Sequence, residues 1–391
     1  MHLTKEEERI YSGEQGWARE ISMKILVRLG DLFDADKLIS INSAHVSGVS
    51  YKTLGDAPIE FLKALADADC KVKVRTTLNP QSLDPDYLDT RVPANMKDKQ
   101  LTILRQFERM GITQSLTCTP YYLAKSQKGS HLAWAESSAV VYANSVLGAY
   151  TNREGGPSAL AAAIIGKTPN YGLHKARNRK PNILVNVETK LKNETEYGAL
   201  GIFLGRILKD KIPLIEGLEK APADNLKQLS AALASTGMTN MFQLKKNRTN
   251  ISELERISVG ARDIEQTIES LCTASTARPD LVFVGCPHCS FDEIKRVTRL
   301  AENRKFKRDL EFWICTSCHV KRRAKESVRK LEGKGGQVLA GVCTVVSWTE
   351  TLGIKTIMTN SAKTAYYAPT LNKAGVILAS AQECLKTVFE G

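Results

Sequence analysis

The stretch DLVFVGCPHCSFDEIKRVTRL, residues 280–300, decides the fold class of this 391-residue chain. Four apolar residues, Leu281–Val284, predict a buried strand, because strands that are covered by helices on both faces carry continuous apolar runs. The following segment, Ser290–Leu300, predicts a helix. A strand followed directly by a helix is the repeating unit of a parallel sheet, so this stretch predicts an α/β fold.

The same alternation of strands and helices continues on both sides of this stretch. The further predicted strands are Leu38–Ile41, Val72–Thr76, Asn182–Val187, Glu311–Ile314, Gln337–Leu339, Lys355–Met358 and Val376–Leu378. The further predicted helices are Ile59–Ala66, Lys97–Met110, Trp134–Gly148, Val320–Leu331 and Ala381–Phe389, besides a first helix that a capping box of Thr4 and Glu7 begins. The chain is therefore predicted to be α/β with mostly parallel sheets. Changes in the pattern predict an N-terminal α/β domain of residues 1–115, a middle α/β domain of residues 116–275 and a C-terminal α/β domain of residues 276–391.

The charge of the chain is strongly basic, with 55 Lys and Arg against 42 Asp and Glu and a formal net charge of +13. This balance favours an anionic partner: a nucleic acid, a membrane surface, or a substrate with a phosphate or carboxylate group. No apolar run reaches the roughly 20 residues that a membrane-spanning helix needs. The N-terminus is polar and acidic and does not have the pattern of a signal peptide. A cytoplasmic protein is therefore expected.

Three of the nine cysteines share one setting. Cys286 and Cys343 each follow a predicted strand, and Cys118 lies in a turn ahead of a helical segment. Loops beyond the carboxyl ends of parallel strands form the ligand-binding crevice of such sheets, and thiolates there could hold an iron–sulfur cluster. Three ligands instead of four would leave one iron open to substrate, as Lewis-acid chemistry requires.

Another cysteine pattern indicates a different metal. Cys286 and Cys289 form one C-x-x-C pair, and Cys315 and Cys318 form a second pair 25 residues further on. This spacing is typical of structural zinc sites, and with basic segments such as Lys321–Lys325 it predicts a zinc-dependent nucleic-acid-binding protein. A third interpretation makes five cysteines buried core residues: Cys289, Cys318, Cys272, Cys70 and Cys384. The spacing alone leaves these interpretations open.

Clusters of polar residues stand near several predicted strand ends. The segment Ser43–Ser50 is expected to be a loop whose backbone N–H groups can hold an anion. Asn79 and Pro80 follow the predicted strand that ends at Thr76, and Glu136 and Ser137 interrupt an apolar helical stretch. The sequence contains no P-loop, no dinucleotide fingerprint and no nucleophile elbow, which disfavours ATP use and hydrolase chemistry of the familiar types.

At these residues the sequence resembles the aconitase X family. The resemblance covers nearly the whole chain from about residue 40. The matching blocks, in chain order, are SAHVSGVSYKTLG (43–55), TTLNP (76–80), CTPYY (118–122), WAESSAVVYANSVLG (134–148), GCPH (285–288), GVCTVV (341–346) and TNSAKTAYYAP (359–369).

The resemblance implies an aconitase-like chain of three α/β/α domains that lacks the mobile swivel domain. It implies an iron–sulfur cluster, of the [4Fe-4S] type, whose protein ligands are Cys118, Cys286 and Cys343. The residues that the resemblance places around the substrate are Gly48, Val49, Ser50, Asn79, Pro80, Glu136 and Ser137. Two cations, Arg153 and Lys363, are the candidates for holding the substrate's carboxylate or phosphate and for stabilising the negative charge that develops during catalysis.

The activity implied is that of a hydro-lyase that dehydrates (R)-5-phosphomevalonate to trans-anhydromevalonate 5-phosphate, in a modified mevalonate pathway to isoprenoids. Dehydration of cis-3-hydroxyproline, the other activity of the family, is the alternative. A separate small subunit is expected to supply the swivel domain and the catalytic base, in a heterodimer or a dimer of heterodimers. Neither a nucleic acid nor a membrane is expected as a partner on this interpretation.

Overall fold

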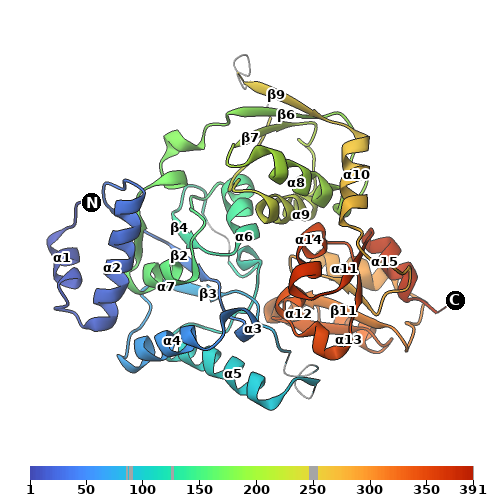
Figure 1. Ribbon diagram of the computed structural model, residues 1–391, viewed down its shortest axis with the longest axis horizontal. Coiled ribbons are helices and arrows are strands. Elements are labelled where there is room, and N and C mark those ends of the chain that lie inside the picture. Colours follow the sequence, from blue (N-terminus) through green and yellow to red (C-terminus); the bar gives the residue numbers. More distant parts are fainter. Residues whose placement is uncertain (85–86, 88–90, 125–126, 246–253, 391) are drawn as a thin grey trace. The chain divides into compact units, whose positions relative to one another are not determined.

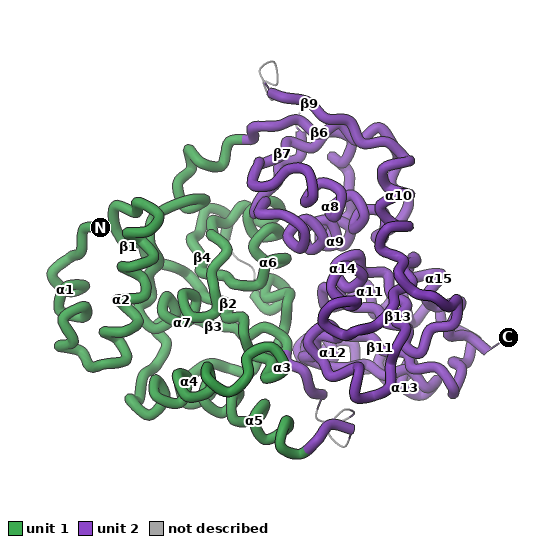
Figure 2. The backbone as a smooth tube through the Cα atoms, viewed as in Figure 1, with its two compact units in different colours: residues 1–80, 94–180 green, residues 81–93, 181–391 purple. Residues whose placement is uncertain are grey.

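The computed structural model describes residues 1–84, 87, 91–124, 127–245 and 254–390. Its chain forms two compact units, and each of them is described by itself (Figure 2). Unit 1 consists of Met1–Pro80 and Ala94–Lys180, and unit 2 consists of Gln81–Pro93 and Pro181–Gly391. Compactness thus groups residues 116–180 with the N-terminal residues, whereas the sequence pattern alone places boundaries near residues 115 and 275.

Unit 1 is built on a short parallel sheet with strand order β3-β2-β4, formed by Arg75–Leu78, Ser43–Val46 and Leu132–Trp134. A separate antiparallel pair joins β1 (Leu38–Ser40) to β5 (Lys167–Pro169). Its helices are α1 (Lys5–Tyr11), α2 (Trp17–Leu32), α3 (Tyr51–Leu54), α4 (Ala57–Asp67), α5 (Ala94–Arg109), α6 (Ser137–Tyr142) and α7 (Gly156–Ile165). The alanine-rich helix α7 is almost entirely buried and packs between β2 and α2 (Figure 1).

Unit 2 contains two parallel sheets. The four-stranded sheet has the order β8-β7-β6-β9, with strands Gln243–Leu244, Pro213–Glu216, Ile183–Val187 and Glu255–Val259. Helices α8 (Glu194–Leu208), α9 (Ala223–Thr236) and α10 (Ala261–Leu271) belong to this part. Gly201 and Gly205 let α8 approach α9, because a Cβ atom at either position would come within 3 Å of the backbone of α9 or of the residue that follows it.

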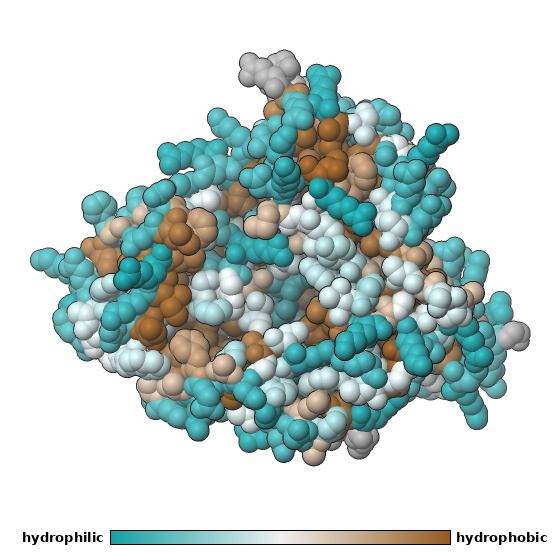
Figure 3. Space-filling model, in the orientation of Figure 1, coloured by the Kyte–Doolittle hydropathy of each residue, from teal (hydrophilic) through white to brown (hydrophobic). Residues whose placement is uncertain are grey.

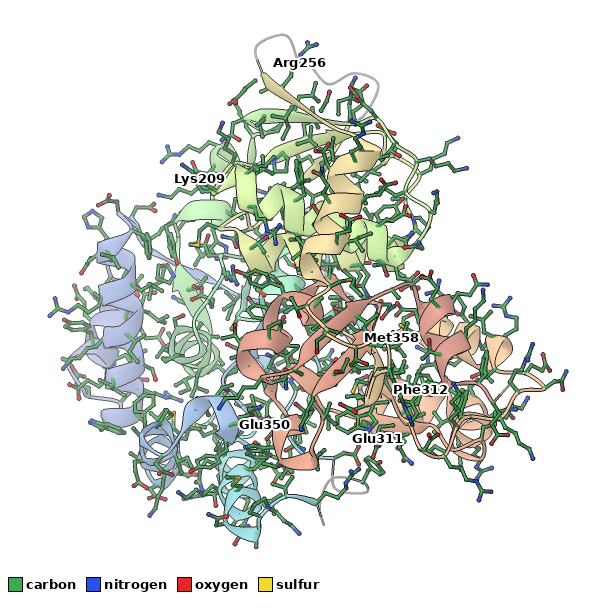
Figure 4. All side chains as sticks on the ribbon, turned by 45° about the vertical axis from the view of Figure 1, so that its right-hand side comes forward. Lys209, Arg256, Glu311, Phe312, Glu350 and Met358 are labelled. Carbon is green, nitrogen blue, oxygen red and sulfur yellow. The ribbon has the colours of Figure 1, made fainter. Side chains whose placement is uncertain are left out.

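The five-stranded sheet of unit 2 has the order β12-β11-β10-β13-β14, and all its pairs are parallel. Its strands are Gln337–Ala340, Glu311–Thr316, Leu281–Val284, Thr356–Thr359 and Gly375–Leu378. Helices α11 (Phe291–Leu300), α12 (Cys318–Arg323), α13 (Lys325–Glu332) and α15 (Ala381–Val388) contribute to one core with the sheet, and α14 (Ala362–Leu371) contacts β13 and β14. Phe312 and Met358 belong to this core, whereas the neighbouring Glu311 bonds to Tyr87 (Figure 4).

The order of these five strands creates a topological switch point. From the central strand β10 the chain continues to β11 and then β12 on one side, while β13 and β14 lie on the other side. Ligands of open parallel sheets bind in the crevice outside the carboxyl ends of the strands at such a point. The residues that follow β10 and β13 are therefore the ones to inspect for a binding site.

Most of the predicted elements are confirmed, with four local corrections. The predicted strand Val72–Thr76 lies instead at Arg75–Leu78, because that is where it pairs with β2. The segment Ser43–Val46 is a buried strand and not the start of a loop, because β2 pairs on both sides with β3 and β4. The predicted helix Trp134–Gly148 divides into the end of β4, helix α6 and a π turn over Ala143–Leu147. The predicted basic helix Val320–Leu331 divides into α12 and α13 at Ala324.

The surface of unit 1 carries an apolar band along α2 (Figure 3). Trp17, Leu32 and Phe33 are exposed large apolar side chains of this region. In the part of the chain that the structure describes, no helix is both long enough and apolar enough to cross a lipid bilayer.

Candidate active site

Two of the predicted cluster ligands follow strands of the same sheet in unit 2. Cys286 lies two residues beyond β10, and Cys343 lies three residues beyond β12. The strands are parallel, so both cysteines are at the carboxyl edge of the five-stranded sheet. Cys286 also follows the central strand, at the switch point of this sheet.

A hydrogen bond connects the two loops that carry these cysteines. The imidazole Nε2 of His288 donates a hydrogen bond to the carbonyl oxygen of Val342 at 2.8 Å, in a buried setting. A carbonyl oxygen only accepts, so this bond fixes the neutral His288 in the tautomer with its proton on Nε2. His288 thus acts as the structural neighbour of the two cysteine loops, with one ring nitrogen already committed to the protein.

The first loop is also bound to the strand that lies between the two cysteines. The amide of Cys289 donates to the carbonyl of Cys315 at 2.9 Å, and the hydroxyl of Thr316 donates to the carbonyl of Cys289 at 2.7 Å. Gly285 has φ +112°, and a Cβ atom there would lie 2.3 Å from the carbonyl oxygen of Cys315. Only glycine allows this loop to approach β11 so closely.

A segment from an earlier part of the chain, residues 81–84, forms hydrogen bonds to the Cys343 loop, and it is called the strap below. Gln81 donates from its amide to the carbonyl of Gly341 and accepts from the amide of Cys343, each at 3.0 Å. Further along the strap, Asp84 accepts a hydrogen bond from the amide of Ala340 at 2.8 Å. The backbone of the Cys343 loop is therefore fixed from Ala340 to the amide of Cys343.

Lys363 stands at the same edge of this sheet as the two cysteines. It is half-buried in the first turn of α14, directly after β13. Strand β13 is the neighbour of β10, so Lys363 and Cys286 flank the switch point from its two sides. The predicted cation thus stands at the carboxyl edge of this sheet, where open parallel sheets bind their ligands, and its role in ligand binding stays a prediction.

The other cysteines of the two C-x-x-C pairs have a different environment. Cys289 and Cys315 are buried, and burial raises the pKa of both thiols well above the ordinary value. Cys318 begins α12, and burial raises the pKa of its thiol as well. Cys289 packs in the apolar core of the five-stranded sheet, and together with the burial of Cys315 this favours the interpretation as core residues over the zinc site. Cys272, in contrast, is exposed, so its assignment to the core is wrong.

In unit 1 the predicted substrate residues follow strands of the three-stranded parallel sheet. Gly48, Val49 and Ser50 follow β2, Asn79 and Pro80 follow β3, and Glu136 and Ser137 follow β4. The structure therefore brings these three segments to one edge of one sheet. Their role in substrate binding stays a prediction.

The third predicted cluster ligand, Cys118, lies at this same edge of unit 1. The amide of its neighbour Thr117 donates to the carbonyl of Leu78, the last residue of β3, at 2.8 Å. Cys118 itself is half-buried. Among the described residues no three His, Cys, Asp or Glu side chains gather into a ready-made metal site.

A buried hydrogen-bond relay connects the strand ends of unit 1. Asn79 Nδ2 donates to the carboxylate of Glu136 at 2.9 Å, which turns its Oδ1 toward His45 Nε2 at 3.4 Å. Since Oδ1 only accepts, His45 carries its proton on Nε2, and its Nδ1 accepts from the Thr77 hydroxyl at 2.7 Å. Burial lowers the pKa of His45 to about 4, against the opposing charge of Glu136. The ring is therefore a neutral orienting group for Asn79.

Glu136 has a second function in the local structure. It is the N-cap residue of α6 and accepts from the amide and the hydroxyl of Ser138 at 3.4 Å and 3.0 Å. Both carboxylate oxygens are thus committed, one to Asn79 and one to Ser138. Sequence analysis singled out Glu136 but did not select His45 or Thr77, because a histidine within a short β-strand gives no signal of its own.

Arg153 is placed beside β4. Its backbone forms a bridge with Trp134, and the amide of Glu154 donates to the carbonyl of Trp134 at 3.0 Å. The Arg153 side chain is half-buried. Arg153 therefore belongs to the same end of the sheet as Glu136.

Gln100 fixes the loop after β2. Its side chain donates to the carbonyl of Val49 at 2.8 Å and accepts from the amide of Tyr51 at 2.9 Å. Gly48 adopts φ +79°, and an apolar cavity of about 220 Å³ lies behind it, lined among others by Leu62 and Phe107. The loop is thus held in one conformation from the α5 side.

Comparison with known proteins assigns the chain to a family. Family models of the aconitase X first, second and third domains match residues 1–177, 181–269 and 279–390. The chain belongs to the aconitase X family. The family resemblance and the α/β fold expected from the sequence are thereby confirmed.

Individual relatives of this aconitase X chain match over its whole length. It is 45% identical to the phosphomevalonate dehydratase large subunit of Methanocaldococcus jannaschii, over 99% of this chain and 100% of that protein. The crystal structure of Thermococcus kodakaraensis aconitase X in its holo-form superposes with a TM-score of 0.92 and 40% identity, covering 99% of this chain and 100% of that one. The cis-3-hydroxy-L-proline dehydratase of Pseudomonas aeruginosa is 30% identical over 98% of this chain and 69% of that protein.

Proposed function

We propose that this aconitase X chain is the large subunit of a hydro-lyase that removes water from (R)-5-phosphomevalonate and releases trans-anhydromevalonate 5-phosphate. The observation that carries the proposal is the full-length match at 45% identity to an archaeal phosphomevalonate dehydratase large subunit. The hydroxyproline dehydratase, at 30% identity, is the more distant relative and its substrate is the second candidate.

We further propose that Cys118, Cys286 and Cys343 are the protein ligands of an iron–sulfur cluster of the [4Fe-4S] type. The donor chemistry fits, since cysteine sulfur is the usual ligand of such clusters. The two loops of unit 2 are held to each other by His288 and Val342, which limits the movement of Cys286 and Cys343. When bound, the cluster supplies a Lewis acid that makes the substrate hydroxyl a better leaving group.

The residues of unit 1 are proposed to bind and orient the substrate. The relay from Thr77 through His45 and Asn79 to Glu136 presents fixed polar groups at the sheet edge. The Gly48–Ser50 loop, whose conformation Gln100 fixes, supplies backbone and hydroxyl donors. Such preorganised donors stabilise charge that develops in the transition state without having to reorient.

Arg153 and Lys363 are proposed to hold the two anionic ends of the substrate. A phosphate and a carboxylate each gain from a cation in a partly buried site, where solvent screens the interaction less. The proton next to the carboxylate is weakly acidic, so a cation near that group stabilises the enolate-like charge when the proton leaves. Part of the net charge of +13 would thus serve an anionic substrate.

A small subunit is proposed as the partner of this chain, in a heterodimer or a dimer of heterodimers. The archaeal relatives carry the words large subunit in their names, and the match covers all of the M. jannaschii protein but only 69% of the hydroxyproline dehydratase. We propose that the small subunit supplies a mobile domain over the substrate, together with the catalytic base, and that the complex acts in the cytoplasm.

The test is to purify the chain with its small subunit under anaerobic conditions and to assay both substrates. The proposal expects water elimination from (R)-5-phosphomevalonate, broad visible absorption, and iron with acid-labile sulfide. Cys286→Ala should lose the absorption, while the matched control Cys70→Ala, a buried cysteine in the core of unit 1, should keep it. A colourless protein with stoichiometric zinc would contradict the cofactor, and turnover of cis-3-hydroxy-L-proline alone would contradict the substrate.

A further inference from the structure

A buried lysine lies beneath the loop that carries Cys286. Lys227 is in α9, and only 1% of its side chain is exposed. An ammonium group that is removed from water needs partners that replace its hydration. Its Nζ donates to the carbonyl oxygen of His288 at 3.1 Å and forms an ion pair with Glu293.

The partner carboxylate binds the other end of the same loop. Glu293 is the third residue of α11 and accepts from the amide of Ser290 at 2.7 Å, while the hydroxyl of Ser290 accepts from the amide of Glu293 at 3.1 Å. Burial raises the pKa of the Glu293 carboxyl, and the charge of Lys227 opposes this rise. One ion pair therefore holds both the carbonyl of residue 288 and the amide of residue 290.

The two bonds set the direction of the His288 side chain as well. With its carbonyl fixed by Lys227, His288 reaches from the Cys286 loop to Val342 in the Cys343 loop. A continuous series of bonds thus runs from α9, through the backbone and ring of His288, to the residue before Cys343. Helix α9 lies in the part that matches the second family domain, and both cysteine loops lie in the part that matches the third.

Stability alone does not account for a buried ion pair of this kind. Replacement of such a pair by apolar residues of similar size is often neutral or stabilising, because the desolvation of two charges offsets their attraction. What the pair provides is a defined position for the groups it binds. Here the groups that it binds are backbone atoms two and four residues after Cys286.

We infer that Lys227, paired with Glu293, is a positioning residue that presets the Cys286 loop, and through His288 the Cys343 loop, for binding of the cluster. This inference rests on the proposed function for the identity of the bound group. Replacement of residues that hydrogen-bond to metal ligands and orient them commonly lowers the metal affinity about 10- to 100-fold. The loss of Lys227 is therefore expected to loosen the cluster without unfolding the chain.

The variant must remove both charges, because Lys227→Met alone leaves an uncompensated carboxylate in the interior. Lys227→Met with Glu293→Gln deletes the bond to His288, while the glutamine oxygen can still accept from the amide of Ser290. The matched control is Lys167→Met with Glu7→Gln. These two residues form an ion pair within unit 1 between distant positions of the same chain, and the glutamate is buried. Lys227→Arg tests rescue, since it restores a cation that can donate to the same carbonyl.

Two readouts on the full chain decide the inference. In the reconstituted holoprotein, iron release to a chelator, followed by visible absorption, should be about tenfold faster in the Lys227→Met, Glu293→Gln variant, close to wild type in the control and restored in part by arginine. In the cluster-free chain, hydrogen exchange of residues 285–292 should also be faster in this variant, with no change in unit 1. If both readouts equal those of wild type in a folded variant, the inference is overturned. If wild type binds no iron, the proposed cofactor is wrong, and the exchange measurement alone still decides whether Lys227 positions the loop.

Discussion

The amide of Cys343 donates a hydrogen bond to the carbonyl oxygen of Gln81, at 3.0 Å and across 262 positions of the chain. Gln81 directly follows Pro80, one of the residues predicted to bind substrate. The residue after the substrate segment is therefore bound to the backbone of a predicted cluster ligand. A shift of the strap that begins at Gln81 would change the position of Cys343.

Replacement of Asp84 by Ala is predicted to loosen this strap. The Asp84 carboxylate is buried and accepts from the amides of Ala340 and Tyr87 at 2.8 Å and 3.1 Å. Without it the partly buried amide of Ala340 loses its acceptor, which costs about 1–3 kcal/mol in the free energy of unfolding. Urea unfolding should show this loss, and hydrogen exchange should show faster exchange at residues 340–343.

Asp309→Ala is the control for the strap, because its ion pair with Arg278 is exposed. Exposed pairs contribute at most about 1 kcal/mol, so the stability of this variant should change little. Equal losses in the two variants would show that Asp84 has no special role.

The Gly285→Ala variant is predicted to be unstable for two separate reasons. The backbone at φ +112° is strained for a residue with a Cβ atom, and that atom would lie 2.3 Å from the carbonyl oxygen of Cys315. Strain and overpacking each cost about 1–3 kcal/mol, so a total near 3 kcal/mol is expected. Gly335→Ala isolates the first cause, since Gly335 has φ +99° and open space around it. Its expected loss is about 1 kcal/mol, and a loss as large as that of Gly285→Ala would contradict the close contact with β11.

Sequence patterns predicted the five-stranded sheet of unit 2 well because its strands are apolar runs between helices. The run Leu281–Val284 is buried along its whole length, and its short length between turn signals favours a strand over a helix. Strand β2 was missed for the opposite reason. Its residues Ser43 and His45 are polar. They can lie in this strand because Trp134 of β4 and Thr77 of β3 form hydrogen bonds with them, and the local sequence does not show these partners.

The residues of the candidate site also fall into those that the sequence marks and those that it does not. The cysteines and polar residues that follow strands could be selected, because the carboxyl ends of parallel strands are where ligands bind. Lys227 could not, since a lysine in a helix is most often at the surface. Its burial depends on Glu293, which is 66 positions away, and on a backbone carbonyl that no sequence pattern marks.

The replacement of Glu136 by Gln is predicted to lower kcat/KM for the dehydration at least about 100-fold. Both carboxylate oxygens accept hydrogen bonds, from Asn79 and from Ser138, and the amide of glutamine can accept on one side only. The relay to His45 would then lose its orientation. Steady-state kinetics of the complex with the small subunit measure the effect. The Glu7→Gln variant, with a buried glutamate paired to Lys167, should stay within about threefold of wild type, and a similar small effect for Glu136→Gln would contradict the predicted role.

His45 is predicted to make the stability of the chain depend on pH. Burial lowers its pKa from 6.5 to about 4, so between these pH values the unfolded chain binds a proton that the folded chain does not. The free energy of unfolding therefore falls as the pH is lowered, by about 2 kcal/mol from pH 7 to pH 5 for this group alone. His174, whose pKa burial lowers to about 3, adds to the same slope.

The His45→Gln variant separates the two histidines. Glutamine does not titrate, so the loss of stability between pH 7 and pH 5 should be smaller by about 2 kcal/mol than in wild type, while the contribution of His174 stays. Urea unfolding at the two pH values measures both slopes. The two proteins are compared by how much their free energy of unfolding changes between pH 7 and pH 5, and not by its absolute value. The absolute value also changes because glutamine removes the bond between Thr77 and the ring at every pH. Equal slopes in the two proteins would show that His45 is protonated as readily in the folded chain as in the unfolded one, and the relay through a neutral ring would then be wrong.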